Sequence, residues 1–370
     1  MNRVMNRARS GWWGGCLGLW ALLCLGACRG GGERQGPGVQ GVLEVLREHS
    51  ARAVYFNAQA HADVVAANPD WLAEGDRQPK SARVRAMAQA VQSPGLFRQL
   101  DRQEHFDALV LAGDPTLYRP LSEHLWKTED WVLGWADGYA VVYRRGAASA
   151  LTLERMRAVV ESSGRMPTEQ RGRWLAAMAD GLVGARRLEW AAEVLEAAQK
   201  VDGGSPAVWA SRAGYHLARG EWGAAIGAAD RALKREGRFR PALSAKAQGL
   251  YKMGRFGDAY QISVRLLEDA PEDPVMLFTH ANIAHEVSAF QEEIAVLRKL
   301  IGIATREGRP VSGYRVYLGQ ALGRVGKGEE ALLELQGALD DPELPPNQRA
   351  FALDARERVR TNMRGLPPGQ

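Results

Sequence analysis

Thiols are nearly absent from this sequence. Its three cysteines, Cys16, Cys24 and Cys28, lie within the first 28 residues, and none follows. This absence excludes a disulfide framework, a cysteine-based zinc site and a thiol nucleophile from the rest of the chain. The lack of thiols after residue 28 suits an oxidising compartment, because that part of the chain has no cysteine that can mispair there.

A marked excess of charge of one sign is also lacking. The formal net charge is +5, but Arg3, Arg7 and Arg9 lie ahead of an apolar run with no acidic residue beside them, and without these three 45 basic residues face 43 acidic ones. This near balance, with no stripe of basic and aromatic residues, argues against nucleic acid as a partner. The composition is 46% hydrophobic and 25% charged, which is typical of a globular chain, and 370 residues suffice for two domains.

An uncharged run, GWWGGCLGLWALLCLGA at residues 11–27, follows the basic residues 1–10. This order is typical of a secretory signal, and 17 residues also meet the lower length limit of a membrane helix. The end of the run, Leu25-Gly26-Ala27-Cys28, resembles the lipobox of bacterial lipoproteins. In that family the chain is cut before the cysteine and the thiol is lipidated. The resemblance therefore implies a signal peptide over 1–27 and lipidation of Cys28.

The alternative for this leader is an uncleaved N-terminal anchor. Both interpretations place the body outside the cytoplasm, because the arginines stay inside. Residues 28–41 are rich in glycine and are expected to form a flexible tether. Arg29, in place of an aspartate after the cysteine, favours the outer membrane facing the periplasm over the inner membrane, if the sorting rule common among enteric bacteria applies.

Small residues recur with a period of 34 in the second half of the chain. When the sequence is aligned with this period, three columns contain alanine. They are Ala179, Ala213, Ala247 and Ala281; Ala191, Ala225 and Ala259; and Ala198 and Ala232. Gly220 and Gly254 mark a turn in the same frame, and after an insertion of four residues the pattern returns with Gly319 and Ala331. The pattern resembles the tetratricopeptide repeat, in which two antiparallel helices approach closely where small residues meet.

The resemblance implies five repeats within 172–345. They lie near 172–205, 206–239, 240–273, 274–311 and 312–345. A linking helix is expected over 151–171, and a capping helix with a tail over 346–370, because such arrays need a polar end for solubility. In the fourth repeat Glu293 stands where the others have alanine, so either the packing differs there or the frame slips to Ile294.

In the tetratricopeptide family, stacked repeats form a superhelix and the first helix of each pair lines its concave face. The predicted partner-binding groove consists of Asp180, Ser244, Gln248, Tyr251, Lys252, Phe278, Asn282, His285, Tyr317, Gln320 and Arg324. Several of these side chains can hydrogen-bond a peptide backbone. The alternative is that they are solvated residues of a curved scaffold. The columns that clamp a terminal carboxylate in some family members hold mostly Ala, Ser, Val or Phe here, which does not support that ligand.

Residues 42–150 differ in pattern and predict a small α/β domain. Runs at 51–58 and 106–114 predict strands, and 131–145 predicts two strands around an Asp137-Gly138 turn. Helical spacing occurs at 82–91 and 96–104. The order of these segments resembles the soluble tail of mannosyltransferase-type membrane glycosyltransferases. Because the family's multi-span catalytic part is absent from this sequence, the resemblance implies an accessory module rather than a transferase.

Four short motifs hold residues that are used in catalysis or metal binding, and each lacks a part. His61 and Asp63 have no third metal ligand, and His280 and His285 are five residues apart, whereas a helical zinc pair needs four. The segment 323–328 lacks the spacing of a phosphate loop, and Asp114, after a predicted strand, has no catalytic partner. No serine lies in a nucleophile elbow. We therefore expect no enzymatic activity, no cofactor and no metal.

The sequence thus predicts an α+β chain, with a small α/β domain followed by an all-α tetratricopeptide-repeat superhelix. We expect a lipid-anchored scaffold that binds a protein or peptide partner in its concave groove, within an envelope assembly such as a secretion, pilus or polysaccharide system. The alternative is a glycan-related enzyme or sugar-binding accessory module in residues 42–150 that the repeats present.

Overall fold

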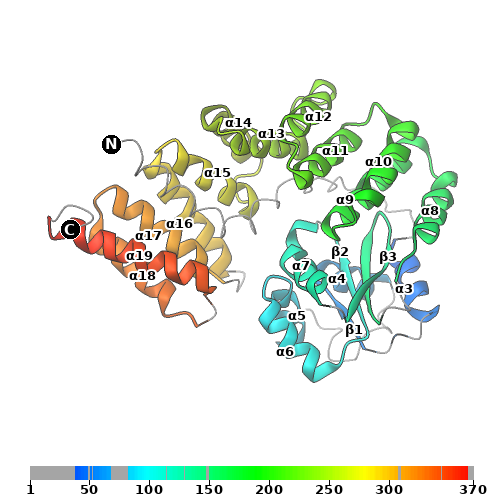
Figure 1. The fold of residues 1–370 in the computed structure, drawn as a ribbon, viewed down its shortest axis with the longest axis horizontal. Coiled ribbons are helices and arrows are strands. Elements are labelled where there is room, and N and C mark those ends of the chain that lie inside the picture. Colours follow the sequence, from blue (N-terminus) through cyan, green and yellow to red (C-terminus); the bar gives the residue numbers. More distant parts are fainter. Residues whose placement is uncertain are drawn as a thin grey trace. The chain divides into compact units, whose positions relative to one another are not determined.

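A computed structural model describes residues 38–48, 51, 53–67, 82–113, 115–128, 130–146, 150–306, 310–342 and 344–365. The described chain divides into two compact units, one ending at Gly249 and the other beginning at Leu250. The division falls inside the helix α13 (Arg240–Lys252). Figure 1 shows the elements of both units.

Helices and strands mix in the first part of the first unit. In chain order these elements are α3 (Gly38–Glu48), β1 (Val54–Phe56), α4 (Ala58–Ala67), α5 (Ala82–Ala90), α6 (Pro94–Glu104), β2 (Ala108–Ala112), α7 (Arg119–Lys127), β3 (Trp131–Ala136), β4 (Ala140–Arg145) and α8 (Leu153–Ser162). The strands form one sheet in the order β1-β2-β4-β3. β1 and β2 are parallel, whereas β4 runs antiparallel to β2 and β3. The predicted strands and the two predicted helices of this region are confirmed.

The sheet is buried on both faces. Leu109 and Leu111 of β2 lie in a core that α5, α6 and α7 also line. The alternate residues Val110 and Ala112 lie in a second core, which α3 and α4 cover. Successive side chains of a strand point to opposite faces, so a strand buried on both faces is apolar throughout, as β2 is.

The β3–β4 hairpin turns at Asp137 and Gly138, as predicted. Asp137 is buried, and its Oδ1 accepts hydrogen bonds from the backbone N–H groups of Tyr139 (2.7 Å) and Ala140 (2.8 Å). Burial raises the pKa of the Asp137 carboxyl to about 6, against the lowering effect of these hydrogen bonds. A Cβ on Gly138 would lie 2.5 Å from the carbonyl oxygen of Trp174, so glycine lets the hairpin tip approach the helix α9 (Thr168–Gly184).

The core of the sheet continues into α9 and the next helix, α10 (Leu188–Asp202). Leu175 and Met178 of α9 belong to the same buried cluster as Leu111 and Val141 of the sheet. A Cβ on Gly181 of α9 would lie 3.2 Å from Val141 Cγ1, which shows how closely the helix approaches β4. The α/β domain therefore shares its hydrophobic core with the first helix pair of the repeats.

Helix pairs cover the part of the chain that shows the 34-residue period (Figure 1). After α9 and α10 they are α11 (Pro206–Arg219) with α12 (Trp222–Arg235), α13 with α14 (Phe256–Asp269), α15 (Pro274–Glu286) with α16 (Phe290–Arg306), and α17 (Ser312–Arg324) with α18 (Gly328–Leu339). The helix α19 (Pro346–Met363) follows the last pair. None of the described helices combines the length and the apolar character needed to cross a membrane.

The turns within the five pairs share one backbone geometry. Each has a residue in the left-handed region, with φ from 58° to 78°, at Arg186, Gly220, Gly254, Ser288 and Gly326. The residue after it donates a backbone hydrogen bond of 2.8–2.9 Å to the carbonyl five positions earlier. This is a helix C-cap that glycine adopts without strain. Because their turns are equivalent, the five pairs are copies of one helix–turn–helix repeat. This confirms the predicted fold class, a small α/β domain followed by all-α repeats of the tetratricopeptide type.

Small residues lie where the helices of a pair meet. Ala179, Ala213, Ala247 and Ala281, which are 34 residues apart, are all buried. In the last pair a Cβ on Gly319 would lie 2.6 Å from Leu335 Cγ, so no side chain fits there without displacing a neighbour. At Gly319 the small-residue column of the sequence therefore marks a close approach of two helices.

Candidate functional site

Three predicted groove residues lie on one face of α15. Phe278, Asn282 and His285 are four and three residues apart, a spacing that places side chains on the same side of a helix. Asn282 Nδ2 donates a hydrogen bond to the Phe278 carbonyl at 2.9 Å. That bond leaves the amide oxygen and the second N–H of Asn282 for another partner. The side chains of Asn282 and His285 are partly exposed.

Aromatic side chains connect this face of α15 to α17, and α17 to α19. The ring of Phe278 lies 5.5 Å, between centroids, from both Tyr314 and Tyr317 of α17, and Tyr317 lies 6.5 Å from Phe351 of α19. We call Phe278, Tyr314, Tyr317 and Phe351 the aromatic row. The sequence reasoning missed Tyr314 and Phe351. Tyr314 precedes Tyr317 by three residues, about one helical turn, and that spacing was the available signal.

Glu293 of α16 is buried where the other repeats have alanine. Its two carboxylate oxygens lie 3.2 and 3.0 Å from Nδ1 of His285. Burial raises the pKa of Glu293, whereas His285 and, more weakly, the positive charge of Arg324 lower it. Two predicted groove residues, from α15 and α17, thus act on one buried carboxylate. Ile294 is buried as well, so both positions contribute to packing in this repeat.

The remaining predicted groove residues of this unit, which begins at Leu250, vary in exposure. Tyr251 Oη donates a hydrogen bond to Glu286 Oε1 at 3.1 Å, and its ring lies 5.2 Å from that of Phe256. Lys252 is partly exposed. Gln320 is buried, which makes it a poor contact for a partner.

In the unit that ends at Gly249, the predicted groove residues are either buried or hydrogen-bonded to a neighbouring helix. Asp180 Oδ2 accepts a hydrogen bond from Ser211 Oγ at 2.8 Å, which joins α9 to α11. Ser244 and Gln248 are both buried on α13. On α15 and α17, the predicted groove residues that keep some exposed surface are Asn282, His285, Tyr317 and Arg324.

His280 belongs to a buried network that only superficially resembles a catalytic triad. Its Nδ1 lies 2.9 Å from Ser263 Oγ and its Nε2 lies 2.9 Å from Glu292 Oε1, while Tyr260 Oη also donates to Glu292. Burial lowers the pKa of His280, although Glu292 opposes this effect. Ser263 and His280 are almost fully buried, so the network lies inside the packed repeats. The network joins α14, α15 and α16.

The other motifs of the sequence are structural or lie outside the described residues. Asp63 accepts hydrogen bonds from Gln59 Nε2 (2.9 Å) and Tyr139 Oη (3.0 Å), which ties α4 to the hairpin. His61 is buried. In the described ranges no three His, Cys, Asp or Glu residues are grouped as a metal site would need. Asp114 and Cys28 lie outside the described residues.

Asn57 closes the edge where β1 and β2 end. Its Nδ2 donates to the Ala112 carbonyl at 2.9 Å, and its Oδ1 accepts from the N–H groups of Ala60 (3.0 Å) and Ala112 (3.1 Å). Ligands of open α/β sheets bind at this edge. Here the buried amide of Asn57 is used to cap α4 and to join the two strands.

Solved structures of several helical-repeat proteins resemble this chain, whereas no protein-family model and no curated protein matches it. YrrB, a TPR protein with an unusual peptide-binding site, has 15% identity and a TM-score of 0.43, over 56% of this chain and 100% of its own. Pseudomonas aeruginosa PilF has 16% identity and a TM-score of 0.41, over 55% and 96%. The Cut9–Hcn1 assembly of APC/C has 13% identity and a TM-score of 0.42, over 81% and 58%. These TM-scores are below 0.5, so the repeat assignment rests on the five equivalent turns and the buried alanine columns.

Proposed function

We propose that this chain is a non-enzymatic scaffold that holds a segment of a partner protein on the faces of α15, α17 and α19. The observation that carries the proposal is the aromatic row, in which Phe278, Tyr314, Tyr317 and Phe351 form a chain of ring contacts across α15, α17 and α19. Phe278 is buried, whereas Tyr314, Tyr317 and Phe351 pack around it and stay partly exposed. Such partly exposed rings offer apolar area at low entropic cost, which is why aromatic residues dominate protein interfaces.

Polar groups beside the row suit the backbone and the charges of such a segment. The free hydrogen-bonding capacity of Asn282 lies next to Phe278 on α15. Arg324 is exposed and is the last residue of α17, on the same side of the helix as Tyr317. An extended peptide or an amphipathic helix that places apolar side chains on the row and an acidic group near Arg324 matches this arrangement.

Photo-crosslinking tests the scaffold in the cell that makes the protein. Benzoylphenylalanine in place of Tyr317 is expected to capture one discrete partner. The matched control is the same replacement at Leu333, which lies on the second helix α18 and is 73% exposed. With the purified partner, Tyr317→Ala and Arg324→Ala are each expected to weaken binding at least about tenfold, or about 1.4 kcal/mol. Equal capture at both positions, or unchanged affinity of the two alanine variants, would count against this face.

We further propose that lipidation of Cys28 tethers the scaffold to an envelope membrane, with the outer membrane facing the periplasm favoured, as part of a secretion, pilus or polysaccharide assembly. The order of basic residues, uncharged run, Leu25-Gly26-Ala27-Cys28 and glycine-rich tether supports this proposal. Cys28→Ala is expected to abolish incorporation of labelled palmitate and to release the protein from membranes. The variants Cys16→Ala and Cys24→Ala, in the same leader, are expected to incorporate label normally. Labelling of the Cys28 variant would overturn the assignment.

A further inference from the structure

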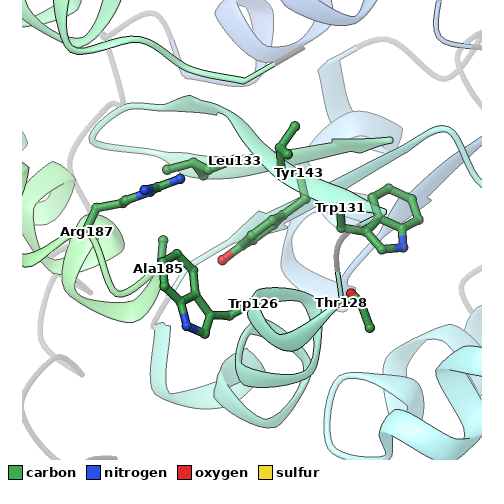
Figure 2. A pocket seen from close by; sticks show the side chains of 8 residues that line it. Trp126, Thr128, Trp131, Leu133, Tyr143, Ala185 and Arg187 are labelled. Atoms are coloured by element: carbon green, nitrogen blue, oxygen red, sulfur yellow. The ribbon is translucent and has the colours of Figure 1, made fainter. Parts of the chain in front are cut away.

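A hollow of about 260 Å³ lies between the α/β domain and the turn of the first helix pair (Figure 2). Its lining residues are Trp126, Thr128, Trp131, Val132, Leu133, Tyr143, Ala185 and Arg187. The end of α7, the β3–β4 hairpin and the α9–α10 turn thus each contribute to one small site. The volume is just below the usual range for ligand pockets, about 300–1,000 Å³, so it suits a ligand of about one ring.

Arg187 is held in this wall by aromatic rings rather than by a carboxylate. Its guanidinium carbon lies 5.2 Å from the ring centroid of Trp126 and 5.1 Å from that of Trp190. Contact with ring faces leaves the in-plane N–H groups of a guanidinium for a planar anion. Its Nε is buried without a hydrogen-bond partner, and in the part of the chain that the structure describes Arg187 makes no ion pair. A half-buried cation without a counter-charge is costly, and a bound anion would remove that cost.

Tyr143 adds a second donor. Its hydroxyl points into the hollow (Figure 2), and the residue is 4% exposed. Burial raises the pKa of Tyr143 to about 12, against the smaller lowering effects of Ser122 and Arg187, so the phenol stays protonated at neutral pH. Within the described residues, neither Tyr143 Oη nor the buried Ser122 Oγ makes a hydrogen bond of good geometry. Hydroxyl and guanidinium donors therefore converge on one place.

We propose that this hollow binds a small ligand that carries one carboxylate on a ring-shaped body. The carboxylate accepts hydrogen bonds from Arg187 and Tyr143 Oη, and the ring packs on the indole of Trp126, which is 49% exposed at the rim. One guanidinium balances one negative charge, so a monoanionic carboxylate fits better than a doubly charged phosphate. The site is independent of the aromatic row on α15, α17 and α19.

The position of Arg187 decides how the site must be tested. A fragment that ends at residue 150 lacks Ala185 and Arg187, so an isolated α/β domain would not contain the complete site. Titration calorimetry on the full chain uses glucuronate and indole-3-acetate as probes, with glucose and indole-3-acetamide as their uncharged counterparts. We expect saturable binding of at least one acid with a Kd below about 1 mM, and none of its uncharged counterpart. The responding acid distinguishes a sugar ring from an aromatic ring.

Substitutions at adjacent arginines provide the matched comparison. Arg187→Gln is expected to weaken binding at least tenfold, while Arg186→Gln, an exposed neighbour with the same charge change, leaves it unchanged. Arg187→Lys keeps the charge but loses the planar fork and is expected to bind more weakly than wild type, which decides the case if the glutamine variant does not fold. Absence of binding by both acids, equal binding of the uncharged counterparts, or wild-type affinity in the folded Arg187 variants would each overturn the proposal.

Discussion

His285→Ala is expected to lower the free energy of unfolding of the unit that begins at Leu250 by about 3 kcal/mol, because it leaves the Glu293 carboxylate buried without its partner. Glu293→Ala is expected to cost at most about 1 kcal/mol, because it restores the alanine found at this position in the other repeats and leaves a histidine that solvent reaches. All eleven tryptophans precede this unit, so its unfolding is followed by circular dichroism. Equal costs for the two substitutions would contradict this account of the pair.

The pH dependence of the same variants provides a second check. Burial raises the pKa of Glu293 above its ordinary value of 4.5, so the stability linked to this group is present below pH 4.5 and is lost as pH rises through the folded-state pKa. His285 lowers that pKa, so its removal raises the pKa further and deepens the loss. The wild type and His285→Ala are therefore expected to differ least near pH 4 and most at neutral pH. A difference that does not change with pH would point to lost packing instead.

Leu175→Ala is expected to destabilise the α/β domain and the first helix pair together, by about 3 kcal/mol, although Leu175 lies on a repeat helix. Leu175 is fully buried and belongs to the cluster that contains Leu109 and Leu111 of β2. Loss of a buried leucine side chain costs about 2–5 kcal/mol, through lost transfer energy and the cavity that remains. Hydrogen exchange followed by mass spectrometry is expected to show reduced protection of both β2 and α9.

The control for this prediction is Arg173→Ala on the same helix. Arg173 is exposed and pairs with Glu169 at the surface, so its loss is expected to cost at most about 0.5 kcal/mol and to leave β2 protected. If Leu175→Ala reduces protection of α9 but not of β2, the sheet and the repeats fold independently. In that case the shared core does not couple them.

Strands and turns could be predicted from the sequence, because their signals come from residues that are close together in the chain. Branched and aromatic residues in 106–114 and the Asp137-Gly138 turn indicated a strand and a hairpin, because strand propensity and turn geometry depend on neighbouring residues. Gly220 and Gly254 marked the turn between two helices in the same way, and the structure shows that both have a positive φ. The equivalent positions Arg186 and Ser288 were missed, because the repeated turn imposes a positive φ there on residues that do not themselves favour it.

Contacts between residues distant in sequence depended on packing. The sequence by itself determined the 34-residue columns, the strands and the residue types on each helix face, because all of these are set by local spacing. Only the tertiary structure decided that Glu293 is satisfied by His285, that Phe278 meets Tyr317, and that Arg187 faces Tyr143 across a hollow. The physical reason is that burial and pairing depend on which helices and strands pack together, and the spacing of residues along one element does not contain that information.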